Sequence, residues 1–424
     1  MADQMKAKFL AIIALIPVFA FTAPAQTTNS WTDGSSKWEM GGNWSAGTPS
    51  SADAANLITN PSTKTVTIDA TTTNAVNIAS MTVSNLMVSA PLDSTNTLFL
   101  NNAGLVTPLD VLNGFTVTTN GALIVTNSAL RVDGLSGGLF SIDGSVVLNG
   151  TGSMASTNAP TIIGNSSSGQ VVISNGTWLA GGVMLGNSAG SQGTLTIVGG
   201  VVSLQALNVG AADCSGTGTV VISGGTLYVT NATHDAVLDV RKGTVIVAGG
   251  SVVVDELVVT NSCYYSNDGL FIHTGGTLSI TSTNLAPDLS AAGDDIPNGW
   301  KQQYGLDPFD PNLDGKDLDG TGFTVLQDYL ADLDPTNSAS VFCITAIDRE
   351  GNDIRVTWNC VGNLFYIIQT NSPAASGSYI NNFTDLSGLI VAPAGVTNTS
   401  YLDSGGATNK PARYYRVLLY QGPI

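Results

Sequence analysis

Short runs of alternating apolar and polar residues fill the chain from about Gly121 to Ile280, with Gly-Gly or Asn-Gly between them. The clearest copy, Gly-Thr-Leu-Thr-Ile-Val-Gly-Gly-Val-Val-Ser-Leu, occupies residues 193–204. Alternation with a period of two is typical of strands with one buried face. A fixed period of this length is typical of stacked repeats. The copies start at Gly121, Gly144, Gly169, Gly193, Gly218, Gly243 and Gly269, at intervals of 23, 25, 24, 25, 25 and 26 residues.

Every repeat also has a third apolar run, after the two that flank the glycine pair. Glycine supplies the positive φ that a tight corner needs. Three strands and three corners per repeat predict an all-β fold, a parallel, right-handed β-helix of about 25-residue rungs over residues 61–285. A stack of flat hairpins is the alternative, but it would not need the third run. The third runs are Val183–Leu185, Ala206–Val209, Ala236–Leu238 and Glu256–Val259.

The phrase Gly-Thr-Val-x-Ile-x-Gly-Gly-x-Leu-x-Val resembles the strand repeats in the passenger regions of bacterial autotransporter-like and other large secreted β-helix proteins. The resemblance covers about 160 residues of the chain. It implies a solenoid architecture and says almost nothing about activity.

The first 25 residues are expected to be a secretory signal peptide. Lys6 and Lys8 precede an apolar run over residues 9–21, and Ala23-Pro24-Ala25 offers a small-x-small cleavage site. No later stretch is apolar over the length that a bilayer requires, so we expect no membrane span. The chain is predicted to be secreted, either extracellular or on a bacterial cell surface.

Three of the six tryptophans, Trp31, Trp38 and Trp44, lie within residues 26–60. The first rung of a solenoid exposes an apolar cross-section and an unpaired edge, so this segment is predicted to be an N-terminal cap. It resembles the opening segment found after the signal peptide in secreted bacterial β-helix repeat proteins. The alternative is a glycan-binding surface built on these rings and Trp178, which requires at least one exposed ring.

Residues 286–338 are acidic and carry the only convincing helices, near 297–304 and 323–331. Residues 317–328 fit the calcium-loop template D-x-[DN]-x-[DN]-G-x5-E with two substitutions. Calcium prefers six to eight oxygen ligands. The expected ligands are the side chains of Asp317, Asp319, Thr321 and Asp328 and the carbonyl of Phe323. The neutral Thr321 and the short Asp328 are expected to weaken affinity.

Further oxygens come from Asp310, Asn312 and Asp314. The whole segment resembles bacterial thrombospondin type 3 repeats and dockerin-like calcium modules, in the motifs at residues 297–300, 304–308 and 334–337. The resemblance implies an EF-hand-like site with calcium as its ligand. An acidic, solvated linker is the alternative.

Residues 339–424 return to short strands at roughly ten-residue spacing, which predicts an antiparallel β-sandwich. Residues 354–358, 365–371 and 412–417 resemble immunoglobulin- or fibronectin-III-like modules of secreted bacterial proteins. In an exported chain Cys343 and Cys360 are expected to form a disulfide. Cys214 and Cys263 lie about two rungs apart, and the sequence leaves their pairing undecided.

Charged residues make up 11% of the chain, and the net charge is −17. The negative net charge argues against nucleic acid as a partner, because binding nucleic acid requires a surface rich in Lys and Arg. It favours cations as ligands. In the repeats, His234, Asp235, Asp239, Arg241 and Lys242 are the best catalytic candidates, but a charged corner explains them equally well.

We therefore expect an exported, non-catalytic stalk with a calcium-ordered joint to a terminal β-sandwich. The sandwich would contact glycan, matrix, a surface protein or a neighbouring copy. The alternatives are a polysaccharide lyase or hydrolase on a β-helix and a glycan-binding module.

Overall fold

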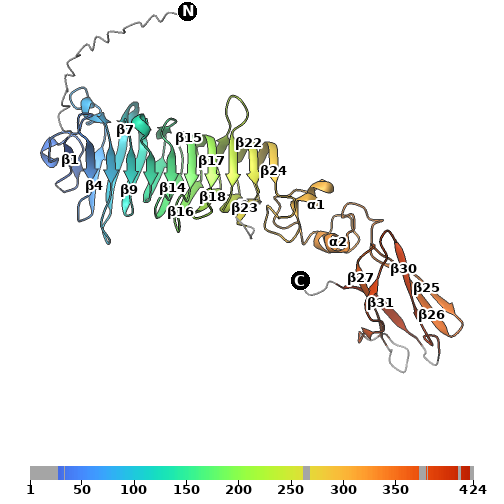
Figure 1. Ribbon diagram of the computed structural model, residues 1–424. Coiled ribbons are helices and arrows are strands. Elements are labelled where there is room, and N and C mark those ends of the chain that lie inside the picture. The colour runs from blue at the N-terminus through green and yellow to red at the C-terminus, as the bar shows by residue number, and fades with distance from the viewer. Residues whose placement is uncertain are drawn as a thin grey trace, which may run out of the picture.

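A computed structural model describes residues 27–32, 34–260, 268–371, 379, 381–408 and 412–420. The predicted signal peptide lies outside these residues. The described chain forms a parallel β-solenoid, followed by a short helical segment and by two antiparallel sheets (Figure 1). This architecture confirms the predicted all-β fold. No helix among the described residues is both long and apolar enough to cross a membrane.

Twenty-four strands form one continuous sheet that winds into three walls with parallel pairing throughout. β7, β9, β15, β17, β22 and β24 are long enough to pass through a corner and contribute to two walls. Wall 1 contains β2 (Ser36–Lys37), β4 (Lys64–Ile68), β7 (Asn96–Val111), β9 (Gly121–Val132), β11 (Ser145–Asn149), β14 (Ser168–Ile173), β16 (Gln192–Ile197), β18 (Thr217–Ile222), β21 (Gly243–Val247) and β23 (Gly269–His273).

Wall 2 contains β5 (Thr82–Val83), the second halves of β7 and β9, β12 (Ser153–Ser156), β15 (Thr177–Leu185), β17 (Val201–Val209), β19 (Thr226–Val229), β22 (Ser251–Val259) and β24 (Thr277–Leu285). Wall 3 contains β1 (Thr28–Ser30), β3 (Ala55–Ile58), β6 (Leu86–Val88), β8 (Phe115–Val117), β10 (Phe140–Ile142), β13 (Thr161–Ile163), β20 (Val237–Val240) and the second halves of β15, β17, β22 and β24. Three 3₁₀ turns, at Gly41–Asn43, Ile78–Met81 and Leu135–Gly137, lie between strands.

The strand alternation follows the sequence pattern closely. In β16, Leu195 and Ile197 point into a fully buried core, while Thr194 and Thr196 face outward. The second glycine of the corner takes a positive φ, for example +67° at Gly225. The third apolar runs form wall 3, and their parallel pairing excludes the stacked-hairpin alternative.

The three N-terminal tryptophans are buried, with 0 to 4% of each side chain exposed. Trp44 packs edge-on against both Trp31 and Trp38, with ring centroids 5.1 and 5.0 Å apart. The Trp38 indole N–H donates to the carbonyl of Ser80 at 3.0 Å. Trp178 is also fully buried. A glycan-binding surface built on these four rings is therefore wrong, because none of them is available to a ligand.

The helical segment is attached to the last turn of wall 1. The backbone N–H groups of Phe271 and His273 donate to the carbonyls of Ala291 and Phe309, at 2.8 and 3.0 Å. The Phe271 and Phe309 rings pack edge to face at 5.0 Å. The predicted helices are present as α1 (Asn298–Gln303) and α2 (Val325–Ala331). A small core of its own stabilises this segment: Ile296, Leu313 and Val325, with Trp300, Leu306, Leu326 and Tyr329 packed against them.

The C-terminal region consists of two antiparallel sheets that share one core, as predicted. Trp358 from the first sheet and Tyr366 and Ile368 from the second are all buried in it. The first sheet contains β25 (Ile344–Glu350), β26 (Asp353–Asn359) and β30 (Asn398–Asp403). The second contains β27 (Phe365–Asn371), β28 (Thr384–Asp385), β29 (Ile390–Val391) and β31 (Tyr414–Tyr420).

The expected Cys343–Cys360 disulfide is wrong, because both cysteines are free. Cys343 is exposed and lies opposite Asn359, whose side chain accepts a hydrogen bond from its backbone N–H at 2.6 Å. Cys360 is the next residue along the chain and is buried in the sandwich core, because successive strand residues face opposite ways. Cys214 is disulfide-bonded, and Cys263 lies outside the described residues.

Candidate functional site: the acidic loop at residues 317–328

Helix α2 positions the last residue of the predicted calcium loop. Thr324 caps the helix: its hydroxyl accepts from the backbone N–H of Gln327, and the Gln327 side chain accepts from the Thr324 N–H at 2.8 Å. This reciprocal capping box fixes where the helix begins. As a result, Asp328 lies in the first turn and faces inward, with only 1% of its surface exposed.

Both carboxylate oxygens of Asp328 are buried without a hydrogen-bond partner. Burial and, after it, the negative charges of three nearby aspartates raise the pKa of Asp328 to about 6. These aspartates are Asp319, Asp317 and Asp334. A buried carboxylate among like charges is unfavourable unless a cation or a hydrogen-bond donor compensates it.

At the start of the loop, aspartate side chains accept hydrogen bonds from backbone N–H groups of the same loop. The two oxygens of Asp317 accept from the N–H groups of Gly320 and Gly322, at 2.8 and 2.9 Å. One oxygen of Asp319 accepts from the Thr321 hydroxyl at 2.8 Å, and the other is buried without a partner. Gly322 has a φ of +87°, as expected for the glycine that makes the sharp turn of such a loop.

The atoms that these residues offer are oxygens, which are the ligands that a hard cation such as calcium prefers. Asp319 and Asp328 together present three buried oxygens without partners. Among the described residues, no group of three or more His, Cys, Asp or Glu side chains is arranged so that it could hold a metal ion by itself. The template also draws on the Thr321 hydroxyl and the Phe323 carbonyl, so carboxylates would supply only part of the coordination.

The second group of predicted ligands lies in the preceding turn and is already engaged. Asp310 forms an ion pair with Lys316, and its other oxygen accepts from the backbone N–H of Asn312 at 2.9 Å. The side chain of Asn312 is exposed, and Asp314 is half-buried. Burial raises the pKa of Asp310, but the bonds from Lys316 and Asn312 outweigh it, so the pKa is below its usual value. Hydrogen bonding and charge pairing therefore favour the 317–328 loop over this turn as a cation site.

Asp334 is the residue that the template did not include. It follows α2, and its charge acts on Asp328. One of its oxygens accepts from the backbone N–H and the hydroxyl of Thr336, at 2.9 and 2.7 Å. The sequence signals for it were its position after the helix and its place at the start of the 334–337 motif.

The catalytic candidates of the solenoid do not converge on one site. Arg241 donates to Asp239 at 2.6 Å, and Lys242 donates to the carbonyl of Cys214 at 2.8 Å. His234 does not join them: its Nδ1 lies 3.3 Å from Asp255 in the next turn.

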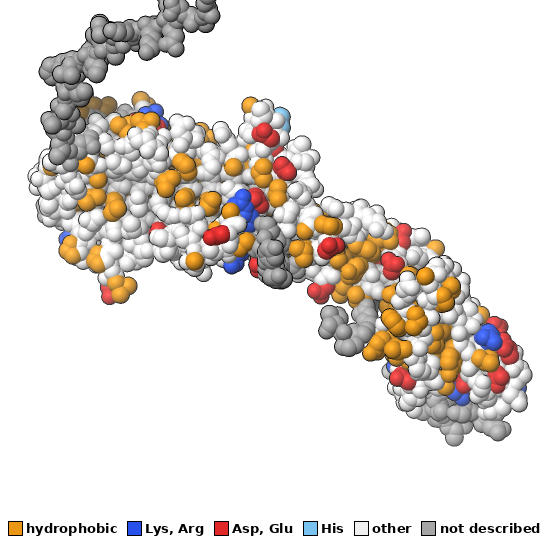
Figure 2. All heavy atoms as spheres, viewed as in Figure 1, with side chains coloured by type: hydrophobic (Ala, Val, Ile, Leu, Met, Phe, Trp, Pro, Cys, Tyr) orange, Lys and Arg blue, Asp and Glu red, His pale blue; other side chains and the backbone are white. Residues whose placement is uncertain are grey.

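A third pair was not foreseen. Arg131 donates to Asp110, which lies directly beside it on the neighbouring strand, at 2.9 Å. Arg131 is also 3.1 Å from Asp133. In the view of Figure 2, charged side chains are sparse over the solenoid, and most of its surface is neither charged nor hydrophobic.

No protein-family model, curated protein or solved structure matches the chain.

Proposed function

We propose that the chain is an exported, non-catalytic structural or adhesive protein. In this proposal the solenoid is a stalk, and calcium in the 317–328 loop makes the joint to the β-sandwich rigid. The supporting observation is the buried, partnerless carboxylate of Asp328, in a segment that lies between the two β-regions (Figure 1).

Apolar side chains of the joint and of the sandwich face each other across a shared cavity. Phe323, Leu330 and Ala331 line one side of a cavity of about 230 Å³, and Phe342 and Leu418 line the other. Asp328 is therefore in the same helix that packs toward the sandwich. A cation that neutralises Asp317, Asp319 and Asp328 would order the loop and hold this helix in place.

A non-catalytic role is consistent with the charged groups of the solenoid. In the Arg241–Asp239 and Arg131–Asp110 pairs, each arginine binds the carboxylate of its partner aspartate. Neither member of a pair is therefore free to act as a general acid or base. The sandwich is the proposed contact for glycan, matrix, a surface protein or a neighbouring copy.

Calorimetric titration of the full chain with calcium, after treatment with a chelator, tests this proposal. We expect saturable binding that is lost in Asp328→Asn and in Asp319→Asn. Asp310→Asn is the matched control and should bind like the wild type, because Asp310 is paired with Lys316. In chelator, Asp328→Asn should be at least as stable as the wild type, because it removes an uncompensated buried charge. Absence of calcium binding up to millimolar concentration would refute the calcium joint.

A further inference from the structure

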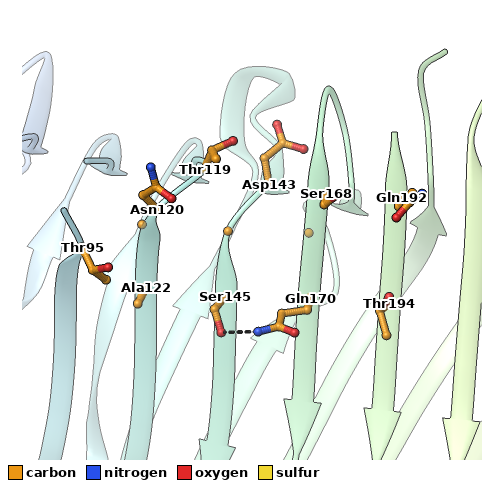
Figure 3. Close-up of a pocket in the computed structure, with 13 residues that line it drawn as sticks. Thr95, Thr119, Asn120, Ala122, Asp143, Ser145, Ser168, Gln170, Gln192 and Thr194 are labelled. Atoms are coloured by element: carbon orange, nitrogen blue, oxygen red, sulfur yellow. Dashed lines mark hydrogen bonds between the residues drawn. The ribbon is translucent and has the colours of Figure 1, made fainter. Parts of the chain in front are cut away.

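A groove of about 380 Å³ crosses wall 1 at the corner where its strands begin. Its lining comes from five successive turns of the solenoid, represented by Thr95, Asn120, Asp143, Ser168 and Gln192 (Figure 3). Neighbouring strands are about 4.8 Å apart, so five turns span roughly 19 Å along the solenoid axis. The groove is therefore long in one direction and periodic along that direction.

The groove presents hydrogen-bonding side chains that the rest of the protein does not use. In the described part of the chain, the side chains of Ser168, Gln192 and Thr194 make no hydrogen bond. Gln170 donates to the hydroxyl of Ser145 at 3.2 Å, which leaves the Gln170 carbonyl oxygen free (Figure 3). Hydroxyl and amide groups can both donate and accept, so a ligand with many hydroxyls would find complementary partners here.

An apolar column runs beside the polar one. Ala122, Ser145, Gln170 and Thr194 are aligned across the strands, and two residues further along lie Ile124, Val147 and Val172, also aligned. The three apolar side chains face outward and are half-buried. The groove thus offers hydrogen-bonding groups next to a strip of hydrocarbon.

The groove has no cationic lining residue and no free strand edge. Its only ionisable lining residue is Asp143, whose oxygens accept from the backbone N–H groups of residues 165–167 and from the Ser166 hydroxyl at 2.6 to 3.1 Å. An anionic polymer would find no cation in it. Because β11, β14 and β16 pair with strands on both sides, a peptide cannot bind here by strand addition.

We infer that this groove binds a linear, neutral oligosaccharide laid along the solenoid axis. Sugar hydroxyls would pair with Gln170, Gln192 and Thr194, and the C–H face of the sugar rings would lie on the apolar column. This site is distant in sequence from the acidic loop and requires no calcium. The inference about sugar binding is therefore independent of the proposed calcium joint.

The test is binding of soluble hexasaccharides to the full chain in the presence of chelator, measured by calorimetry and ligand-observed NMR. The probes are cellohexaose, maltohexaose and chitohexaose, with an oligogalacturonate and a Ser/Thr-rich peptide of similar length for comparison. We expect saturable binding of at least one neutral sugar. Gln170→Ala combined with Gln192→Ala should weaken it about tenfold, as expected for the loss of two hydrogen bonds, and Thr194→Trp should abolish it by filling the groove.

Thr219 provides the matched control. It continues the same column one turn further on, outside the groove. Thr219→Ala and Thr219→Trp should therefore leave sugar affinity unchanged. The inference is overturned if no neutral hexasaccharide binds, if the Thr219 variants weaken binding as much as the groove variants, or if the oligogalacturonate or the peptide binds more tightly.

Discussion

At the scale of single residues, the second glycine of each corner is a position that tolerates no side chain. Gly225 has a φ of +67°, and a Cβ there would lie 2.6 Å from the backbone carbon of Gly199 and from the oxygen of Gly200. The left-handed conformation costs a non-glycine residue about 1–2 kcal/mol, and the backbone contact adds to that. Close stacking of successive turns at this corner therefore requires a residue without a side chain.

Gly225→Ala should lower the free energy of unfolding by about 2 kcal/mol or more, measured by urea denaturation followed by circular dichroism. Gly182→Ala is the control. A Cβ at Gly182 meets no atom within 4 Å, so that variant should be neutral or slightly stabilised. Equal destabilisation of the two variants would contradict this explanation.

Asp143 is a second constrained residue, because its buried carboxylate holds the turn at residues 165–167. Burial alone raises the pKa of Asp143, but the hydrogen bonds from the Ser166 hydroxyl and from three backbone N–H groups outweigh it and lower the pKa. A carboxyl whose folded pKa lies below its unfolded value of about 3.9 stabilises the protein fully above that pH. The stabilisation is lost as the pH falls through the lower, folded pKa.

Asp143→Asn should therefore cost about 1–3 kcal/mol at pH 7, and the difference from the wild type should shrink below about pH 4. Thermal unfolding at pH 7, 5, 4 and 3 measures it. Ser166→Ala, which removes one of the four bonds, should have a smaller effect. A stability difference that stays constant down to pH 3 would show that the charge of Asp143 is not the cause.

At the scale of elements, the N-terminal end is closed by side chains and by the folding back of its own strand. Trp31 and Trp44 form an antiparallel bridge, so the outer edge of wall 3 is paired within the chain next to β1. The Trp38 ring is fully buried and also hydrogen-bonded to Ser80. The bridge keeps another strand from adding beside β1, and the buried rings cover the apolar end of the core.

Trp38→Ala should destabilise the first turns by about 3–5 kcal/mol, because it leaves a large cavity and an unpaired carbonyl. Hydrogen exchange of β4 should accelerate, while β18, far along the solenoid, should stay protected. Trp38→Phe keeps most of the packing and should have a smaller effect on β4. Faster exchange throughout the solenoid would contradict a local role for this cap.

The elements could be predicted from the sequence because their causes are local. The alternation around Leu195 and Ile197 fixes which side faces the core, and the Gly-Gly pairs fix the corners. The capping box of α2 lies within four residues. Spacing along the chain is enough for such features.

Features that depend on contacts between distant segments could not be predicted. Arg131 meets Asp110 only because β7 and β9 pair in one particular register. The opposite orientations of Cys343 and Cys360 likewise depend on how two strands of the sandwich pair. The groove on wall 1 also becomes visible only after five turns are aligned, because no single turn contains it.

At the scale of the whole molecule, the proposed calcium site should control how the solenoid and the sandwich are held relative to each other. Small-angle X-ray scattering should show a narrower distribution of interatomic distances with calcium than in chelator. At neutral pH a bound cation would relieve the repulsion among Asp317, Asp319 and Asp328. Asp328→Asn should give the same scattering curve in both conditions, and Asp310→Asn should respond like the wild type. A calcium-independent wild-type curve would contradict a role in rigidity.

The parallel stacking of equal turns has a consequence for length. Each turn pairs only with the turn before it and the turn after it, so the solenoid behaves as a row of interchangeable units between a fixed start and a fixed end. Removing one complete 24-residue unit, such as residues 169–192, would bring the two ends about 4.8 Å closer together and leave both of them chemically unchanged. The number of units therefore sets the length of the solenoid, and with it the distance between the tryptophan cap and the terminal sandwich, independently of what either end binds.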